Sequence, residues 1–245
     1  MNSVLLYVIV VLFLATLIRS AFGFGEALVA VPLLALRIPV EVAAPLAVLM
    51  SITVAAVIVL QDWRKIHLRS ASWLVLFSFL GIPLGLWLLT RADDRLMKAM
   101  LAVLVVAFAS YSLFGRRRLE LRDDHRLWLF GAGFLGGVLG GAYGMNGPPL
   151  VIYGSMRRWS PQHFRATLQG YFLPASLLGM AGYALAGLWV PAVTWYYCVS
   201  LPSALAAIVL GRVINDRLSG EAFLKYVYLG LIAIGALLLV QAFRG

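Results

Sequence analysis

Two short stretches of the sequence combine glycine with a polar side chain and lie between apolar runs. The first holds Gly23, Gly25 and Glu26, and the second runs from Gly144 to Pro148. Glycine lets the backbone approach a ligand closely and adopt positive φ. A helix that begins beyond it presents free N–H groups and partial positive charge, which favour an anion. The predicted substrate-binding residues are therefore Gly23, Gly25, Gly144, Met145, Asn146, Gly147 and Pro148.

Glu26 and Asn146 are the polar side chains of these stretches. We predict Glu26 at the start of a helix, where a carboxylate is favourable, and at membrane depth it could take up a proton or a cation. Because an ionised Glu26 would repel an anion, binding of an anion would favour its protonation. The alternative is a helix-capping carboxylate in a wet vestibule. Asn146 both donates and accepts hydrogen bonds, and Pro148 suits the first turn of a helix.

Arg165 and Gln169 are four residues apart, so on a helix they share a face. If that face points inward, the pair would attract and orient an oxyanion, and we add both residues to the predicted substrate-binding set. The alternative is that Arg165 only extends toward the lipid headgroups.

The sequence shows no credible grouping for catalysis or metal binding. It lacks a GKS/T phosphate loop and a Ser/His/Asp or Cys/His grouping. The three histidines lie in separate predicted loops without metal-ligand spacing. Cys198, the only cysteine, is expected to be a small buried residue. We therefore expect no enzyme activity, no cofactor and no metal.

The composition is that of a membrane protein. Of 245 residues, 62% are hydrophobic and 12% are charged, whereas a soluble domain has about half and about a quarter. The net charge of +10 comes mainly from basic residues between apolar runs, where they set topology, so nucleic-acid binding is not expected. The clearest runs of membrane-spanning length are Val42–Leu60, Ala71–Leu89, Leu96–Phe114, Thr167–Leu188 and Ala222–Ala242.

We predict an all-α, polytopic transmembrane bundle in a single membrane domain. Two segments, 26–36 and 147–156, would extend only about 15 Å, half of a ~30 Å hydrocarbon core. Each follows a longer segment across a glycine-rich break, which predicts a broken or re-entrant hairpin inside protein or beside a watery cavity. The ten predicted segments are 4–18, 26–36, 42–60, 71–89, 96–114, 127–143, 147–156, 165–188, 190–211 and 222–242.

Basic residues predict the orientation of the chain. The loops after the third, fifth, seventh and ninth segments are rich in Lys and Arg, whereas the loop at Gly187–Pro191 has none. Because positive residues mark the cytoplasmic side, both termini are predicted to lie outside. The first segment has no basic residue before it, so we expect a retained helix rather than a signal peptide.

The two halves of the sequence resemble each other. Moving the chain by 122 residues superposes Gly25–Val29 on Gly147–Val151. Repeat 1 then covers about 1–115 and repeat 2 about 126–245, each with five segments, so the repeats run in opposite directions through the membrane. Inverted repeats with interrupted helices in matching positions are characteristic of secondary transporters. For the glycines between Gly131 and Gly141, tight helix packing is the favoured interpretation.

Both glycine-rich stretches, with their flanks, carry a family resemblance. Ser20-Ala21-Phe22-Gly23-Phe24-Gly25 with Val31-Pro32, and Gly140-Gly141-Ala142-Tyr143-Gly144-Met145-Asn146-Gly147-Pro148-Pro149, resemble the duplicated signature of the sulfite exporter TauE/SafE family. Phe164–Gln169 is similar to one branch of it. The resemblance covers nearly the whole chain, and it implies a bacterial-type plasma-membrane permease for small anions, chiefly sulfite or organosulfonates.

We therefore expect a secondary transporter for a small anion such as sulfite, an organosulfonate or a carboxylate, with the proton as the candidate coupling ion. The lipid bilayer is its expected surrounding, and a homo-oligomer is compatible with the sequence. The alternatives are a structural or assembly protein and a membrane-embedded enzyme. A scaffold has no need of polar breaks at the membrane midplane, and this favours transport.

Overall fold

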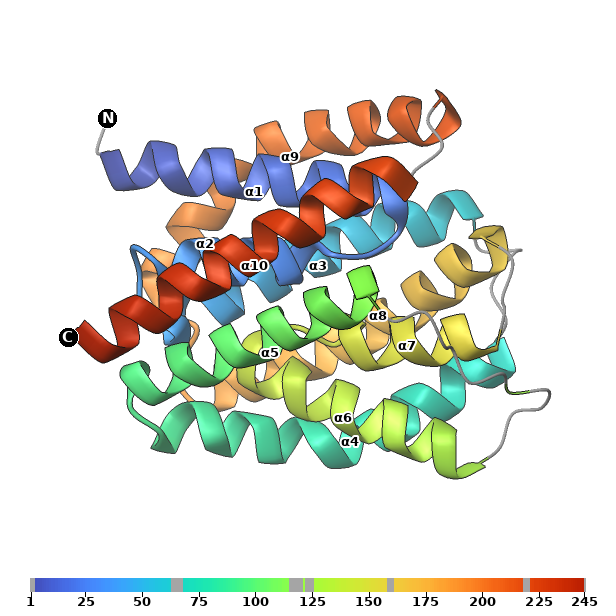
Figure 1. The fold of residues 1–245 in the computed structure, drawn as a ribbon, viewed down its shortest axis with the longest axis horizontal. Coiled ribbons are helices and arrows are strands. Elements are labelled where there is room, and N and C mark those ends of the chain that lie inside the picture. Colours follow the sequence, from blue (N-terminus) through green and yellow to red (C-terminus); the bar gives the residue numbers. More distant parts are fainter. Residues whose placement is uncertain are drawn as a thin grey trace.

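The computed structural model describes residues 3–62, 68–114, 121, 126–157, 161–217 and 221–244, and only the backbone at 61–62, 68–70, 161–163, 165–166, 215–217, 221–224 and 244. The described residues form ten α-helices, as predicted, and their axes run broadly along the long axis of Figure 1. The helices are α1 (Ser3–Phe22), α2 (Glu26–Ala35), α3 (Val40–Asp62), α4 (Leu68–Arg91), α5 (Asp94–Phe114), α6 (Arg126–Tyr143), α7 (Gly147–Met156), α8 (Pro161–Leu185), α9 (Pro191–Arg217) and α10 (Glu221–Arg244).

Six helices in the described part of the chain are long and apolar enough to cross a membrane: α1, α3, α4, α5, α9 and α10. The helices α6 and α8 have 18 and 25 residues but are not among these six. Six glycines lie in α6, and Gln162, His163 and Arg165 lie in the first turns of α8.

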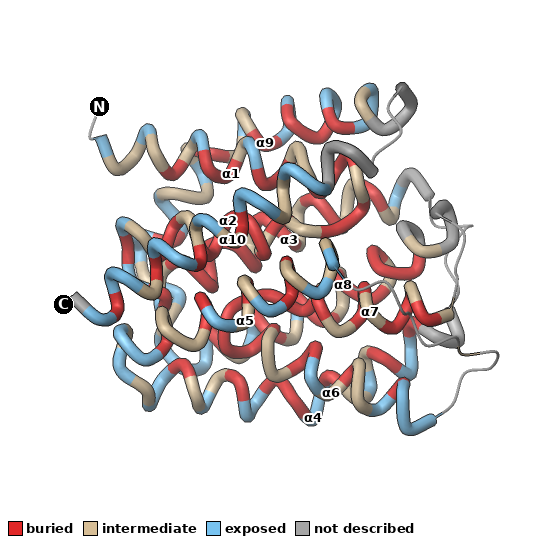
Figure 2. Tube along the Cα trace, in the orientation of Figure 1, coloured by how far each residue is buried: buried red, intermediate tan, exposed pale blue. Residues whose placement is uncertain are grey.

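The surface of the bundle is apolar, as expected of a protein whose solvent is lipid. Large apolar side chains are exposed on the outer helices, among them Phe79 on α4 and Val209 on α9, while buried residues concentrate toward the interior (Figure 2). Cys198 on α9 is exposed as well, so the expectation that it is buried is wrong. Its helix presents this side chain outward, where an apolar solvent accepts it.

The helical path is broken twice, between α1 and α2 and between α6 and α7. The helices α2 and α7 have ten residues each, which confirms the two predicted short segments. The chain turns through left-handed glycines, with φ of 84° at Gly23, 98° at Gly25 and 66° at Gly144. Residues that carry a side chain rarely adopt this backbone conformation, so the turns require glycine. Gly23 and Gly144 are 121 residues apart, as are the first residues of α2 and α7. This spacing is one residue shorter than the 122-residue shift that superposes the two glycine-rich sequences.

Glycines bring α4 and α6 into close backbone contact. A Cβ atom at Gly137 would lie 2.3 Å from the Ser78 carbonyl oxygen, and one at Gly141 would lie 2.2 Å from the Ile82 carbonyl oxygen. From α4, a Cβ at Gly81 would lie 2.1 Å from the Phe134 carbonyl oxygen. The predicted packing role is thus confirmed for Gly137 and Gly141, since small residues let membrane helices approach closely.

The most extensive helix contacts join the first five helices to the last five. Helix α1 packs along α9, α6 along α4, α3 on α8, and α5 on α10. In Figure 1, α1 and α6 run in opposite directions, and the chain begins and ends at the same end of the bundle.

Candidate functional site

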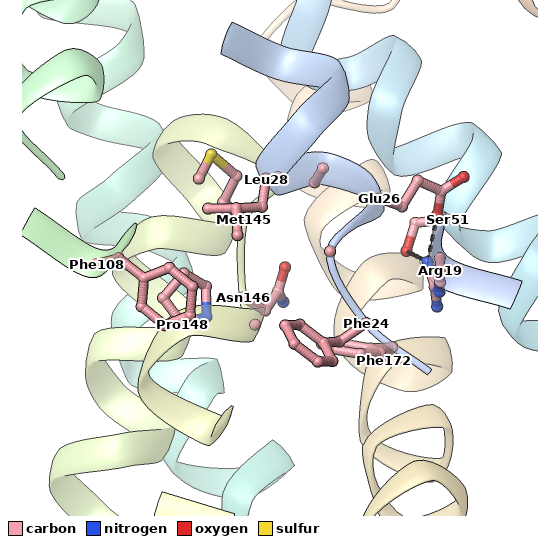
Figure 3. Close-up of a pocket in the computed structure, with 14 residues that line it drawn as sticks. Arg19, Phe24, Glu26, Leu28, Ser51, Phe108, Met145, Asn146, Pro148 and Phe172 are labelled. Carbon is pink, nitrogen blue, oxygen red and sulfur yellow. Dashed lines mark hydrogen bonds and ion pairs between the residues drawn. The ribbon is translucent and has the colours of Figure 1, made fainter. Parts of the chain in front are cut away.

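The two breaks meet at one small cavity inside the bundle (Figure 3). From the first break, Phe24, Gly25 and Glu26 line it, followed by Ala27 and Leu28 of α2. From the second break come Gly144, Met145, Asn146, Gly147 and Pro148; Arg19, Ser51, Phe108 and Phe172 complete the wall. The cavity has a volume of about 30 Å³. That is room for roughly two water molecules.

A buried ion pair forms part of this wall. Arg19, in the last turn of α1, places Nη1 2.5 Å from Oε2 of Glu26, the first residue of α2. The two side chains are 3% and 1% exposed. The turn at Gly23 and Gly25 reverses the chain over seven residues, so the two charges meet across the break. Thr16 also donates to Oε1 of Glu26, at 3.1 Å. Glu26 therefore lies at a helix start as predicted, but its carboxylate is buried and paired rather than in a wet vestibule.

The guanidinium of Arg19 donates only from its outer nitrogens. Nη1 donates to Glu26 and, at 2.6 Å, to Oγ of Ser51 on α3. Nη2 donates to Oε1 of Gln169 on α8, at 2.8 Å. Nε is buried and has no acceptor among the residues that the structure describes. Nε and Nη2 lie on one edge of the planar guanidinium, the kind of edge that binds an oxyanion through two oxygens. In this structure Nη2 donates to Gln169, and Nε is the nitrogen without an acceptor among the described residues.

Gln169 lies behind this guanidinium rather than at the cavity wall. It is 1% exposed, accepts from Arg19 and donates from Nε2 to the carbonyl oxygen of Gly23, at 2.7 Å. Gly23, another predicted site residue, is likewise outside the cavity lining and contributes this carbonyl.

The starts of α2 and α7 offer the cavity different donors. In α2, Val29 makes the first helical bond, to the Gly25 carbonyl, so the N–H groups of the first three residues point toward the helix start without a helical acceptor. In α7, Pro148 and Pro149 have no N–H, so the dipole remains but Gly147 is the only donor among the first three residues. Asn146 caps α7 without a side-chain capping bond.

Gly140 on α6 leaves space for the Asn146 side chain. A Cβ atom at Gly140 would lie 2.7 Å from Nδ2 of Asn146. The amide itself is 5% exposed and lines the cavity. In the view of Figure 3, Asn146 and Met145 lie on one side and the Arg19–Glu26 pair on the other, with the rings of Phe24 and Phe172 between them.

Aromatic rings supply the apolar part of the wall. The Arg19 guanidinium carbon lies 5.0 Å from the centre of the Phe172 ring, an arrangement that attracts a cation to the ring face. Phe24 packs edge-on against Phe164, with centroids 6.1 Å apart. The site thus combines a buried ion pair, one side-chain amide and backbone N–H groups with a largely apolar lining, as ligand sites usually do.

Comparison with known proteins decides the family. The family model for the sulfite exporter TauE/SafE proteins matches residues 8–239. The chain belongs to the TauE/SafE family. It is therefore a multi-pass membrane transporter and not an enzyme, and the predicted resemblance is confirmed. No curated protein and no solved structure matches the chain.

In this TauE/SafE transporter, seven of the ten predicted site residues line one cavity: Gly25, Glu26, Gly144, Met145, Asn146, Gly147 and Pro148. Gly23 and Gln169 lie in the hydrogen-bonded layer behind them. Arg165 lies on α8, but its side chain is outside the described residues. Within the described chain, no group of three or more His, Cys, Asp or Glu side chains is placed to hold a metal.

Sequence reasoning missed seven wall residues, among them Arg19, Ser51 and Phe172. A signal for Arg19 was present, because an arginine directly after an apolar run and seven residues before Glu26 is a rare ionisable group at membrane depth. Ser51 and Phe172 carry no such signal, since serine and phenylalanine are ordinary residues of membrane helices.

Proposed function

We propose that this TauE/SafE transporter is a secondary permease of a bacterial-type plasma membrane that moves a small oxyanion through the cavity between the two breaks. The observation that carries the proposal is Arg19, a buried guanidinium at the cavity wall whose Nε has no acceptor among the described residues. Sulfite, an organosulfonate and a carboxylate all present two oxygens to a guanidinium edge. The N–H groups of α2 and the amide of Asn146 are the further donors at the wall.

The cavity must widen for such an anion, since its present volume of about 30 Å³ holds only roughly two waters. We propose that it opens to either side by movement of one half of the chain against the other, as in transporters built from inverted repeats. Two features support this. The breaks are 121 residues apart, and exchanging the two halves of the chain turns the α1–α9 pair into the α6–α4 pair. The opposite directions of α1 and α6 in Figure 1 fit the same scheme.

Glu26 is the proposed site of proton coupling. With Arg19 it forms a pair of net zero charge, so an incoming anion would leave an excess negative charge in an apolar surrounding. Taking up one proton on Glu26 removes that excess, because burial strongly disfavours an uncompensated charge. One proton would then cross with each monovalent anion.

Arg165 has a proposed auxiliary role. It precedes Gln169 by about one turn of α8, at the basic end of that helix. From there a positive side chain would raise the local concentration of anions before they reach Arg19.

A flux measurement in proteoliposomes tests the proposal. Purified protein is reconstituted, and uptake of sulfite, a short organosulfonate and a short carboxylate is measured with and without a pH gradient. Arg19→Lys keeps the positive charge beside Glu26 but removes the planar fork, so we expect uptake to fall at least about tenfold. Arg37→Lys is the matched control, because Arg37 lies over the Tyr7 ring, away from the cavity.

The result answers two separate questions: whether the protein transports these anions, and whether Arg19 takes part in binding them. Absence of uptake for all three anions would overturn the anion proposal. Uptake by wild type that Arg19→Lys leaves unchanged would remove Arg19 from the site but keep the transporter.

A further inference from the structure

Gln169 joins the two halves of the chain through both ends of one amide. Its Oε1 accepts from Arg19 Nη2 at 2.8 Å, and its Nε2 donates to the Gly23 carbonyl at 2.7 Å. The partners lie 150 and 146 residues away in sequence, on either side of the α1 end. One side chain of α8 therefore holds both the charged group and the backbone turn of the first break.

The turn depends on this amide. Gly23 has φ of 84°, and its carbonyl oxygen lies in a buried hydrogen bond, where a carbonyl without a donor would be costly. Gln169 supplies that donor. A second, longer link runs parallel to it, with Ser51 Oγ of α3 3.3 Å from Ser176 Oγ of α8.

The second break is held differently. There, Tyr183 of α8 donates to the Gly140 carbonyl of α6 at 2.9 Å, within the second half of the chain. Helix α8 thus contacts both breaks, and at the first break its Gln169 holds Arg19, the guanidinium of the cavity wall.

We infer that Gln169 is a positioning residue and not a substrate contact: it latches the first break to α8, and it is released when an anion draws Arg19 toward the cavity. This inference rests on the proposed function only for the identity of the releasing ligand. The latch itself follows from the two bonds. Because Gln169 is outside the cavity lining, its loss should change how readily the break opens more than how tightly the anion binds.

An accessibility experiment tests the latch without any need for transport. Cys198, the only cysteine, is replaced by alanine, and Ala27→Cys is introduced at the cavity wall on α2. Reaction with a membrane-impermeant thiol reagent is then timed in open membrane fragments, where the reagent reaches both faces. Gln169→Met keeps the side-chain length and removes both bonds, so we expect the reaction at residue 27 to be roughly tenfold faster.

Two further variants sharpen the result. Gln169→Glu keeps an acceptor for Arg19 but loses the donor to Gly23, so an intermediate acceleration is expected. Tyr183→Phe is the matched control, since it removes one buried bond of the same helix at the other break, and it should react like the parent.

Kinetics separate the latch from a binding role. For Gln169→Met we expect a KM for the transported anion within about threefold of wild type, with a changed maximal rate. An unchanged reaction rate at residue 27 would overturn the latch, and so would a KM raised tenfold or more with an unchanged maximal rate. If no anion is transported at all, the proposed function fails while the labelling result still decides the latch.

Discussion

Arg19 and Glu26, seven residues apart, face each other across the break between α1 and α2 as an ion pair with 2.5 Å between Nη1 and Oε2. Both side chains are almost completely buried. Burying two charges is expensive, and their mutual attraction offsets the cost only with good geometry and additional hydrogen bonds. Thr16, Ser51 and Gln169 supply these bonds. Since this pair lies at the cavity between the two breaks, the proposed function predicts that changing it affects both stability and transport.

Removing one member of this pair should destabilise the protein more than removing both. Arg19→Met alone leaves Glu26 as an uncompensated buried charge, at an expected cost of about 3–5 kcal/mol. Arg19→Met combined with Glu26→Gln should recover most of that loss but transport no anion. Thermal unfolding in detergent measures the stabilities, and a double variant no more stable than the single one would contradict the prediction.

Glu26→Gln should abolish the response of uptake to a pH gradient. In wild type, acid on the side from which the anion enters should increase uptake, because protonated Glu26 offsets the charge of the anion. Glutamine is neutral at every pH, so uptake by the variant should be the same with and without the gradient. A variant with the wild-type pH profile would remove Glu26 from the coupling.

Gly140→Ala should impair transport through Asn146. The new Cβ would lie 2.7 Å from Nδ2 of Asn146 and displace this amide from the cavity wall. We expect at least about a tenfold increase in KM if Asn146 contacts the anion, from one lost hydrogen bond and the displaced wall. Gly131→Ala, on the same helix with nothing within 4 Å of its Cβ position, is the control and should transport normally.

Gly137→Ala should lower stability rather than substrate affinity. Its Cβ would lie 2.3 Å from the Ser78 carbonyl oxygen. This contact is with backbone that cannot move without separating α4 from α6. Overpacking of this kind costs about 1–3 kcal/mol, whereas Gly131→Ala should be neutral or slightly stabilising. Equal unfolding temperatures for the two variants would show that the helix contact is looser than described.

Single cysteines at Asn2 and Gly245, in a chain without Cys198, should both react with an impermeant reagent from outside the cell. The prediction follows from the basic loops and agrees with the chain beginning and ending at one end of the bundle (Figure 1). Labelling from opposite sides would contradict the proposed inverted repeat.

Much of the fold follows from the sequence because lipid imposes simple requirements on a chain. Apolar length predicts helices, and both ten-residue helices were predicted because they are too short to span and follow glycine. The breaks were located for the same reason, since positive φ at Gly23 and Gly144 requires glycine whatever the surroundings. The spacing of the two turns, 121 residues, differs by one from the 122-residue shift that superposes the sequences, because sequence comparison matches residue types and not backbone conformations.

The sequence by itself determined a membrane protein with ten helices, two glycine-led breaks and a family signature, since these depend on local composition and short-range conformation. Only the tertiary structure decided that the two breaks line a single cavity and that Arg19 joins Glu26 in its wall as an ion pair. It also placed Gln169 behind that charge rather than in the cavity. The physical reason is distance along the chain: these contacts join residues up to 150 positions apart. Side chains so far apart meet only when the helices that carry them have packed.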